Sequence, residues 1–164
     1  MKPVLFENVR LIDPASGLDR AGRLLVRDGV IAGTDQPGAE GAPDGAEIID
    51  GQNQLVLCPG LVDMRVTIGE PGFEYRETVA SAARAAVSGG ITTIAVLPNT
   101  SPTIDNPALA RLLRARGEET GMIDILPYGA LTRECAGKEM AEIGLLAEAG
   151  AIAFTDGPHA IADS

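Results

Sequence analysis

Few residues in this chain are able to perform nucleophilic or metal chemistry. There is one histidine, His159, and the two cysteines, Cys58 and Cys135, are far apart. A catalytic zinc usually has three protein ligands, which one histidine and two distant cysteines cannot furnish. A Ser-His-Asp triad would have to use His159, and no Gly-x-Ser-x-Gly motif accompanies it. Nucleophilic hydrolysis by such a triad is therefore not expected.

Composition narrows the possible partners. Gly-x-Gly-x-x-Gly is missing, so nucleotide binding loses its best sequence signal. The 164 residues carry 13 Lys and Arg against 23 Asp and Glu, a formal net charge of −10, which argues against a nucleic-acid partner. No apolar run approaches the roughly 20 residues that span a bilayer, and residues 1–4 lack the apolar core of a secretory signal. We expect no membrane partner and a cytoplasmic protein.

Residues 1–58 have the pattern of a small β-rich segment. Apolar stretches alternate with turn signals, and Asp28-Gly29 is a typical hairpin turn. Strands are predicted at residues 4–12, 23–26, 30–32, 47–50 and 54–57.

From Pro59 onward, apolar strands alternate with amphipathic helices, which indicates parallel βα units. The four strands are predicted at residues 61–66, 91–97, 123–128 and 151–155. Between them, three helices are expected to bury Val79, Ala82, Ala83, Ala86 and Val87, then Leu109, Leu112 and Leu113, then Met140, Ile143, Leu146 and Ala147. Gly89-Gly90 predicts the end of the first helix, and Asn106 with Pro107 predicts the start of the second.

The predicted fold class is α/β. Four such units fit either an open doubly wound sheet or the first half of a (β/α)₈ barrel, which needs roughly 250 residues. The sequence is too short for the whole barrel, and no closing helix follows the fourth strand. We interpret residues 59–164 as an incomplete fold.

Two segments, residues 59–72 and 153–156, have residue patterns that overall composition does not explain. A barrel would place both segments at its C-terminal rim, where active-site loops lie. The first reads Pro-Gly-Leu-Val-Asp-Met-Arg-Val-Thr-Ile-Gly-Glu-Pro-Gly. It resembles the dihydroorotase and cyclic amidohydrolase signature Pro-Gly-x-x-Asp-x-His-x-His-x-Arg-Glu-Pro-Gly. Similar segments follow in the family's order at residues 73–78, 89–93, 98–102, 104–106 and 153–156. The resemblance implies the first four βα units of a TIM-like (β/α)₈ barrel at residues 59–164, preceded at residues 1–58 by part of a composite β-sandwich.

The departures from this signature concern the metal and substrate ligands. The family's two histidines fall on Arg65 and Thr67, and its substrate-carboxylate arginine falls on Gly69. Residues i and i+2 of a strand share a face, so two histidines at that spacing can bind one metal. A guanidinium has no lone pair to offer, and a threonine hydroxyl is a poor zinc ligand. The half of the metal site that the first strand supplies is therefore missing. The arginine that would bind a substrate carboxylate through two parallel hydrogen bonds is missing as well.

Two residues still match family positions. Asn99 matches a substrate-contacting asparagine, although a turn residue at this position is an equally simple interpretation. Asp156 matches the first Asp of the family's Asp-Asp-Gly, whose second Asp is Gly157 here. Asp156 would be a metal ligand in an active enzyme, but we expect it to form an ion pair with Arg65 instead. His159 matches no family ligand, and no catalytic residue is expected.

Three functions follow from these residues. The resemblance to inactive paralogues favours a non-catalytic dihydroorotase-like protein of pyrimidine biosynthesis, a pseudoenzyme that assembles with aspartate transcarbamoylase or with itself. Zinc serves the family, but no cofactor is expected in this chain. The alternative is an active metal-dependent dihydroorotase, or another hydrolase of cyclic amide C–N bonds. The third is an unrelated βα module that binds an anionic metabolite at its strand ends.

Overall fold

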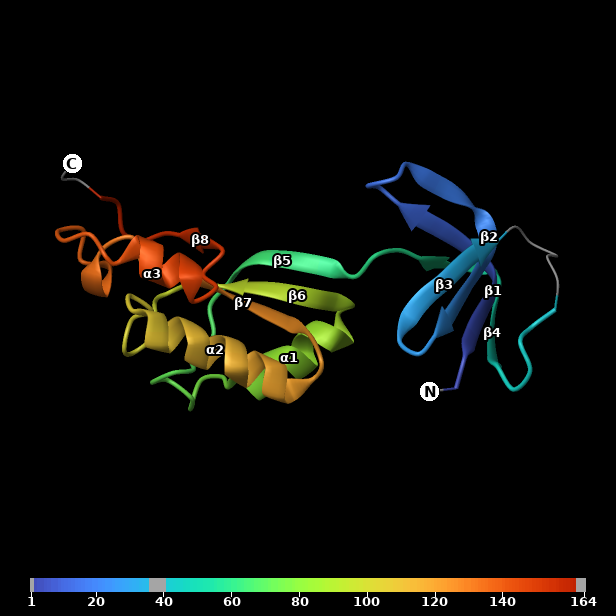
Figure 1. Ribbon diagram of the computed structural model, residues 1–164, viewed down its shortest axis with the longest axis horizontal. Coiled ribbons are helices and arrows are strands. Elements are labelled where there is room, and N and C mark those ends of the chain that lie inside the picture. The colour runs from blue at the N-terminus through green and yellow to red at the C-terminus, as the bar shows by residue number, and fades with distance from the viewer. Residues whose placement is uncertain (1, 36–40, 162–164) are drawn as a thin grey trace. The chain divides into compact units, whose positions relative to one another are not determined.

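The structure is a computed structural model that describes residues 2–35 and 41–161 (Figure 1). Residues 162–164, the end of the predicted barrel segment, lie outside the described residues. The chain divides into two compact units, Met1–Pro59 and Gly60–Ser164, which we describe separately. Within the described ranges, no helix is long and apolar enough to cross a membrane.

The first unit is a four-stranded sheet in the order β3-β2-β1-β4. Its strands are β1 (Val4–Asp13), β2 (Leu18–Arg27), β3 (Val30–Asp35) and β4 (Glu47–Leu57). β1 pairs antiparallel with β2 and parallel with β4, and Asp28 and Gly29 turn β2 into β3 with positive φ. The two strands predicted at 47–50 and 54–57 form one strand, because an irregularity with positive φ at Gln52 and Asn53 joins them. That this sheet belongs to a composite β-sandwich stays a prediction.

The second unit is built on a parallel sheet in the order β5-β6-β7-β8. Its strands are β5 (Leu61–Val66), β6 (Ile91–Val96), β7 (Asp124–Gly129) and β8 (Ala153–Phe154), and its helices are α1 (Val79–Ser88), α2 (Pro107–Thr120) and α3 (Ile143–Glu148), with a 3-10 turn at Arg133–Cys135. Strands consecutive in the chain are neighbours in the sheet, as in the first half of a (β/α)₈ barrel. The predicted α/β class and strand order are confirmed.

Side-chain caps start α1 and α2, and the sequence predicts the start of α2. Thr78 caps α1 through a capping box with Ser81, and the Asn106 side chain accepts hydrogen bonds from the amides of Ala108 and Leu109 at the start of α2. Pro107 occupies the first position of α2, where its missing N–H breaks no helical hydrogen bond. These caps fix the points at which the loops after β5 and β6 end.

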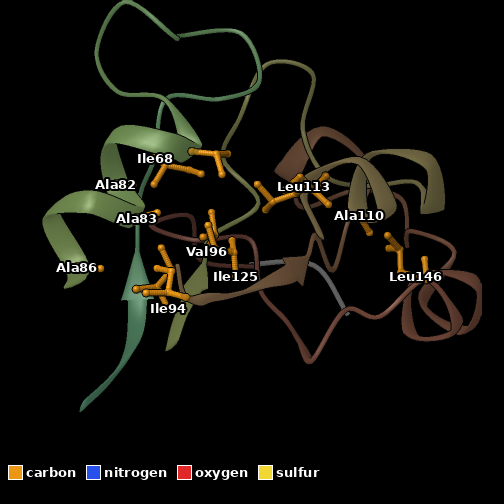
Figure 2. Packing of buried hydrophobic residues seen from close by; sticks show 14 of the residues in the cluster. Ile68, Ala82, Ala83, Ala86, Ile94, Val96, Ala110, Leu113, Ile125 and Leu146 are labelled. Atoms are coloured by element: carbon orange, nitrogen blue, oxygen red, sulfur yellow. The ribbon is translucent and has the colours of Figure 1, made fainter. Parts of the chain in front are cut away.

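The core of the second unit lies between the sheet and the helices, as Figure 2 shows. Ile94 and Val96 of β6 and Ile125 of β7 face Ala83 of α1 and Leu113 of α2. Figure 1 shows α1 and α2 along the same face of the sheet. This packing holds the carboxyl ends of the strands in register.

Several residues expected in this core are exposed, namely Val87, Leu112, Met140 and Ala147. Val87 and Leu112 lie at the margins of their helical faces, which are narrower than the sequence indicates because alanines make up much of the buried surface. α3 begins only at Ile143, so Met140 lies in the preceding loop, where it bridges to Thr132. The third helix is therefore shorter than predicted.

Candidate functional site

Three loops follow the carboxyl ends of β5, β6 and β7, and together with residues 155–161 they form what we call the rim. They are the first loop (67–78), the second loop (97–106) and the third loop (130–142). The Ser101 amide of the second loop donates to the Pro71 carbonyl of the first at 3.0 Å. The Ala130 amide of the third loop donates to the Ile104 carbonyl of the second at 2.8 Å. Backbone hydrogen bonds thus connect all three loops.

Arg65 and Thr67 lie where β5 becomes irregular. Asp63 pairs with Ile94 and Val66 with Val96, so three steps along β5 match two along β6. The Arg65 amide donates to Asp63 Oδ1 at 3.0 Å. Thr67 follows the last residue of β5, and both side chains are exposed. The regular pairing of β5 with β6 is therefore interrupted between Asp63 and Val66.

Tyr128 ties this irregular segment to the rest of the sheet. Its hydroxyl, on β7, donates to the Met64 carbonyl of β5 at 3.0 Å. The bond passes over β6, which separates the two strands in the sheet. Sequence reasoning missed this contact because Tyr128 belongs to no motif.

Asp156 is buried, with 3% of its surface exposed, and its carboxylate is bound by the third loop. Oδ1 accepts the Leu131 amide at 3.0 Å and the Thr132 amide at 2.8 Å, and Oδ2 accepts the Thr132 hydroxyl. No ion pair joins Asp156 to the exposed Arg65, both of which the structure describes, so the expected ion pair is wrong. Nearby neutral donors satisfy this carboxylate in place of a cation.

Gly69 is enclosed by the backbone of its own loop. The Phe73 amide donates to the Gly69 carbonyl, so the chain folds back on itself after residue 69. A Cβ atom at Gly69 would lie 2.1 Å from the Phe73 carbonyl oxygen and 2.7 Å from that of Glu77. The first loop therefore occupies the space that an arginine at this position would need.

Glu70 anchors the start of α1. Its Oε2 accepts the Val79 amide at 2.9 Å, and its Oε1 lies 3.6 Å from Arg116 Nε of α2. A carboxylate here also complements the positive end of the helix dipole. The matched motif includes Glu70, but its sequence position alone does not reveal this role.

Glu70→Ala should destabilise the second unit by about 1 kcal/mol, because the Val79 amide and the helix dipole lose a carboxylate partner. Glu70→Gln keeps an acceptor oxygen and should lose less. Urea denaturation of the two variants and the wild type measures the difference. Equal stability of Glu70→Ala and the wild type would contradict the capping role.

Asn99 is half-buried in the second loop, three residues after β6, and its Oδ1 is a buried acceptor without a hydrogen-bond partner in the described parts of the chain. An asparagine that shapes a turn typically uses this oxygen to accept a nearby backbone N–H. Here the oxygen makes no such bond, so the turn interpretation loses its main support. A substrate-binding role for Asn99 stays a prediction.

The two cysteines differ in environment. Cys58 is exposed, whereas Cys135 is buried in the third loop. Burial raises the pKa of the Cys135 thiol to about 11, and the negative charges of Asp156 and Asp105 act in the same direction. Cys135 is therefore an unreactive thiol beside the Asp156 carboxylate.

Alkylation should distinguish the two thiols. At pH 8 a thiol with a pKa near 11 is ionised to roughly one part in a thousand, so iodoacetamide should label Cys58 long before Cys135. Peptide mass spectrometry after timed quenching measures both rates. Labelling in urea is the control, in which both cysteines should react. Comparable rates in the folded protein would contradict the burial of Cys135.

The residues at this rim do not fit a zinc site. Arg65 offers no lone pair, Thr67 is a poor ligand, and Asp156 is committed to the third loop. Over residues 2–35 and 41–161, no three His, Cys, Asp or Glu side chains are grouped as metal ligands.

The model of the family described as dihydro-orotase-like matches residues 54–163. The chain belongs to this family. The resemblance found in the sequence is thereby confirmed. The chain is 48% identical to a dihydroorotase of Pelobacter propionicus, over 93% of this chain and 35% of that protein. It is 37% identical to a dihydroorotase of Citrifermentans bemidjiense, over 98% of this chain and 37% of that protein.

The fold of the dihydro-orotase-like chain is similar to that of two solved structures. It matches L-hydantoinase (dihydropyrimidinase) from Arthrobacter aurescens with a TM-score of 0.76 and 25% identity, over 94% of this chain and 32% of that one. D-hydantoinase (dihydropyrimidinase) from a Thermus species matches with a TM-score of 0.65 and 22% identity, over 88% of this chain and 30% of that one, which shows the fold alone. The chain spans about a third of the length of these relatives. Because the chain belongs to this family, the third candidate function, that of an unrelated βα module, is wrong.

Proposed function

We propose that this dihydro-orotase-like chain belongs to a non-catalytic protein of cytoplasmic pyrimidine biosynthesis. Relatives named dihydroorotase support the pathway. The observation that carries the non-catalytic assignment is the pair Arg65 and Thr67, which stand where the family signature has two histidines.

The electrostatics at β5 oppose metal binding. The guanidinium of Arg65 carries a fixed positive charge, which repels a divalent cation. Thr67 offers only a neutral hydroxyl oxygen, which zinc binds poorly. Gly69 supplies no fork for a substrate carboxylate, and its surroundings leave no room for one. The changes that oppose metal binding, at Arg65 and Thr67, and the change that opposes substrate binding, at Gly69, all fall within residues 65–69.

The alternative is an active hydrolase of a cyclic amide, with metal ligands drawn from other parts of the protein. The unpartnered Oδ1 of Asn99 favours this function, because an N–H group of a cyclic amide would satisfy the buried acceptor. In such an enzyme the metal would polarise the amide carbonyl and activate water. Asn99 would then orient the ring.

Zinc content and ring-opening activity of the full-length protein distinguish the two functions. Protein purified without chelator should contain far less than one zinc per chain and should not open dihydroorotate. Stoichiometric zinc together with ring opening would establish the active alternative.

Substitution tests the role of the β5 residues directly. Arg65→His with Thr67→His should raise zinc occupancy of the full-length protein, because two imidazoles replace a cation and a weak ligand. The matched control is Arg65→Gln with Thr67→Ser, which removes the charge without adding a strong ligand. Equal zinc contents in the two double variants would show that residues 65 and 67 do not face a metal position.

The proposed partner is aspartate transcarbamoylase, with self-association as the other possibility. The resemblance to inactive paralogues that support this enzyme motivates the proposal. Sedimentation of the full-length protein with the transcarbamoylase of the same organism should give a complex larger than either component. Unchanged sedimentation of the transcarbamoylase would contradict the partnership, and a larger species of this protein alone would indicate self-association.

A further inference from the structure

Most of the hydrogen-bonding capacity of the Asp156 carboxylate is taken up by donors within the protein. It lies after β8 and receives two backbone amides and one hydroxyl from residues 131 and 132. A carboxylate has about four lone-pair positions, so three of them are occupied. This pattern is typical of a side chain that organises a loop.

Thr132 extends the same network into the third loop. Its hydroxyl oxygen accepts the Gly137 amide at 2.8 Å, and an amide is able only to donate. The single hydroxyl hydrogen is therefore free to point at Asp156 Oδ2. Thr132 is 6% exposed, so water does not readily replace either partner. The Thr132 hydroxyl thus links the Asp156 carboxylate to the Gly137 amide through two hydrogen bonds.

A second carboxylate holds the other side of the third loop. Asp105 Oδ2, in the second loop, accepts the Glu134 amide at 3.0 Å. Glu134 and Cys135 both have positive φ, at 57° and 55°, which is uncommon for residues other than glycine. The surrounding hydrogen bonds stabilise this tight backbone conformation between the two carboxylates.

We propose that Asp156 is a positioning residue that fastens the third loop to the end of β8, and that the rim keeps this conformation without a metal. A metal drawing on the Asp156 oxygens would compete with the amides of Leu131 and Thr132 for the same lone pairs. This role holds whether the full-length protein is active or not, because it depends only on contacts within the second unit.

Hydrogen exchange of the full-length protein, measured by mass spectrometry, tests this role. Asp156→Ala should speed exchange in peptides covering residues 130–137 by about tenfold or more, while peptides from β1 and α1 remain unchanged. Thr132→Val should act in the same direction, and Thr132→Ser, which keeps the hydroxyl, should restore protection. Asp124→Ala is the matched control, since Asp124 is an exposed carboxylate at the start of β7.

Metal dependence separates a fastening residue from a ligand. Adding zinc or chelator to the wild-type protein should leave exchange in residues 130–137 unchanged, and Asp156→Ala should leave its zinc content unchanged. The proposal is overturned if zinc protects this loop, or if Asp156→Ala lowers zinc content without altering exchange. If Asp156→Ala fails to fold, Thr132→Val and Thr132→Ser decide the question by the same exchange measurement, with equal protection in both overturning the role.

Discussion

Gly69→Ala is expected to destabilise the second unit by about 3 kcal/mol, at the upper end of the usual penalty for overpacking. The new methyl group would meet the carbonyl oxygens of Phe73 and Glu77 at 2.1 and 2.7 Å. Both are backbone atoms, so no side-chain rotation relieves the contact. Either the first loop shifts or its Phe73–Gly69 hydrogen bond breaks. Urea denaturation of the variant and the wild type measures the loss.

Gly144→Ala is the matched control. Gly144 lies in α3 and has no positive φ, and among the described residues a methyl group added to it would meet no atom within 4 Å beyond its chain neighbours and the backbone of its own helix. Alanine is the better helix former, so this variant should equal or exceed the wild type by up to about 1 kcal/mol. If the two glycine variants had the same stability, the enclosure of Gly69 would be wrong.

The Gly69 contacts also limit any attempt to restore the family's substrate arginine. Arginine carries the same Cβ as alanine and a far longer side chain, so it meets the same two carbonyl oxygens. A restored site would need changes in the first loop itself, beyond the substitution at residue 69. Loss of the arginine and the conformation of this loop are therefore linked.

The elements of the second unit are predictable because their signals are local. Asn106 and Pro107 mark the start of α2 through interactions within four residues, and parallel strands follow from the alternation of strand and helix. Val87 and Leu112 show the limit of this reasoning, since periodicity identifies a helical face but not its width. Only the packing partners decide where that face ends.

The rim was less predictable because its contacts join residues far apart in the sequence. Asp156 binds the amides of Leu131 and Thr132, in a loop with no hydrophobic periodicity. The sequence offered Arg65 as the obvious partner by charge, yet Arg65 is exposed and Asp156 is buried. Every residue except proline has a backbone amide, so a single sequence does not indicate which amides bind a given carboxylate.

Leu113→Ala should destabilise the second unit by about 2 to 5 kcal/mol, the usual range for a buried leucine. Leu113 is 1% exposed and belongs to the core that joins α2 to the sheet. Truncation removes apolar contacts and leaves a cavity that rigid neighbours on β6 and β7 fill only in part. Urea denaturation followed by circular dichroism measures the change.

The neighbouring Leu112→Ala supplies the control, because Leu112 is 43% exposed on the same helix. Leucine and alanine are both good helix formers, so intrinsic helix propensity contributes little to the comparison. Leu112→Ala should cost less than about 1 kcal/mol, the range of ordinary surface changes. The sequence predicts both leucines in the core and therefore similar losses, whereas the structure predicts a clear difference. If the two variants lost similar free energies of unfolding, α2 would have to be rotated differently about its axis on the sheet. The Asn106 cap, which ends the second loop, would then be placed differently as well.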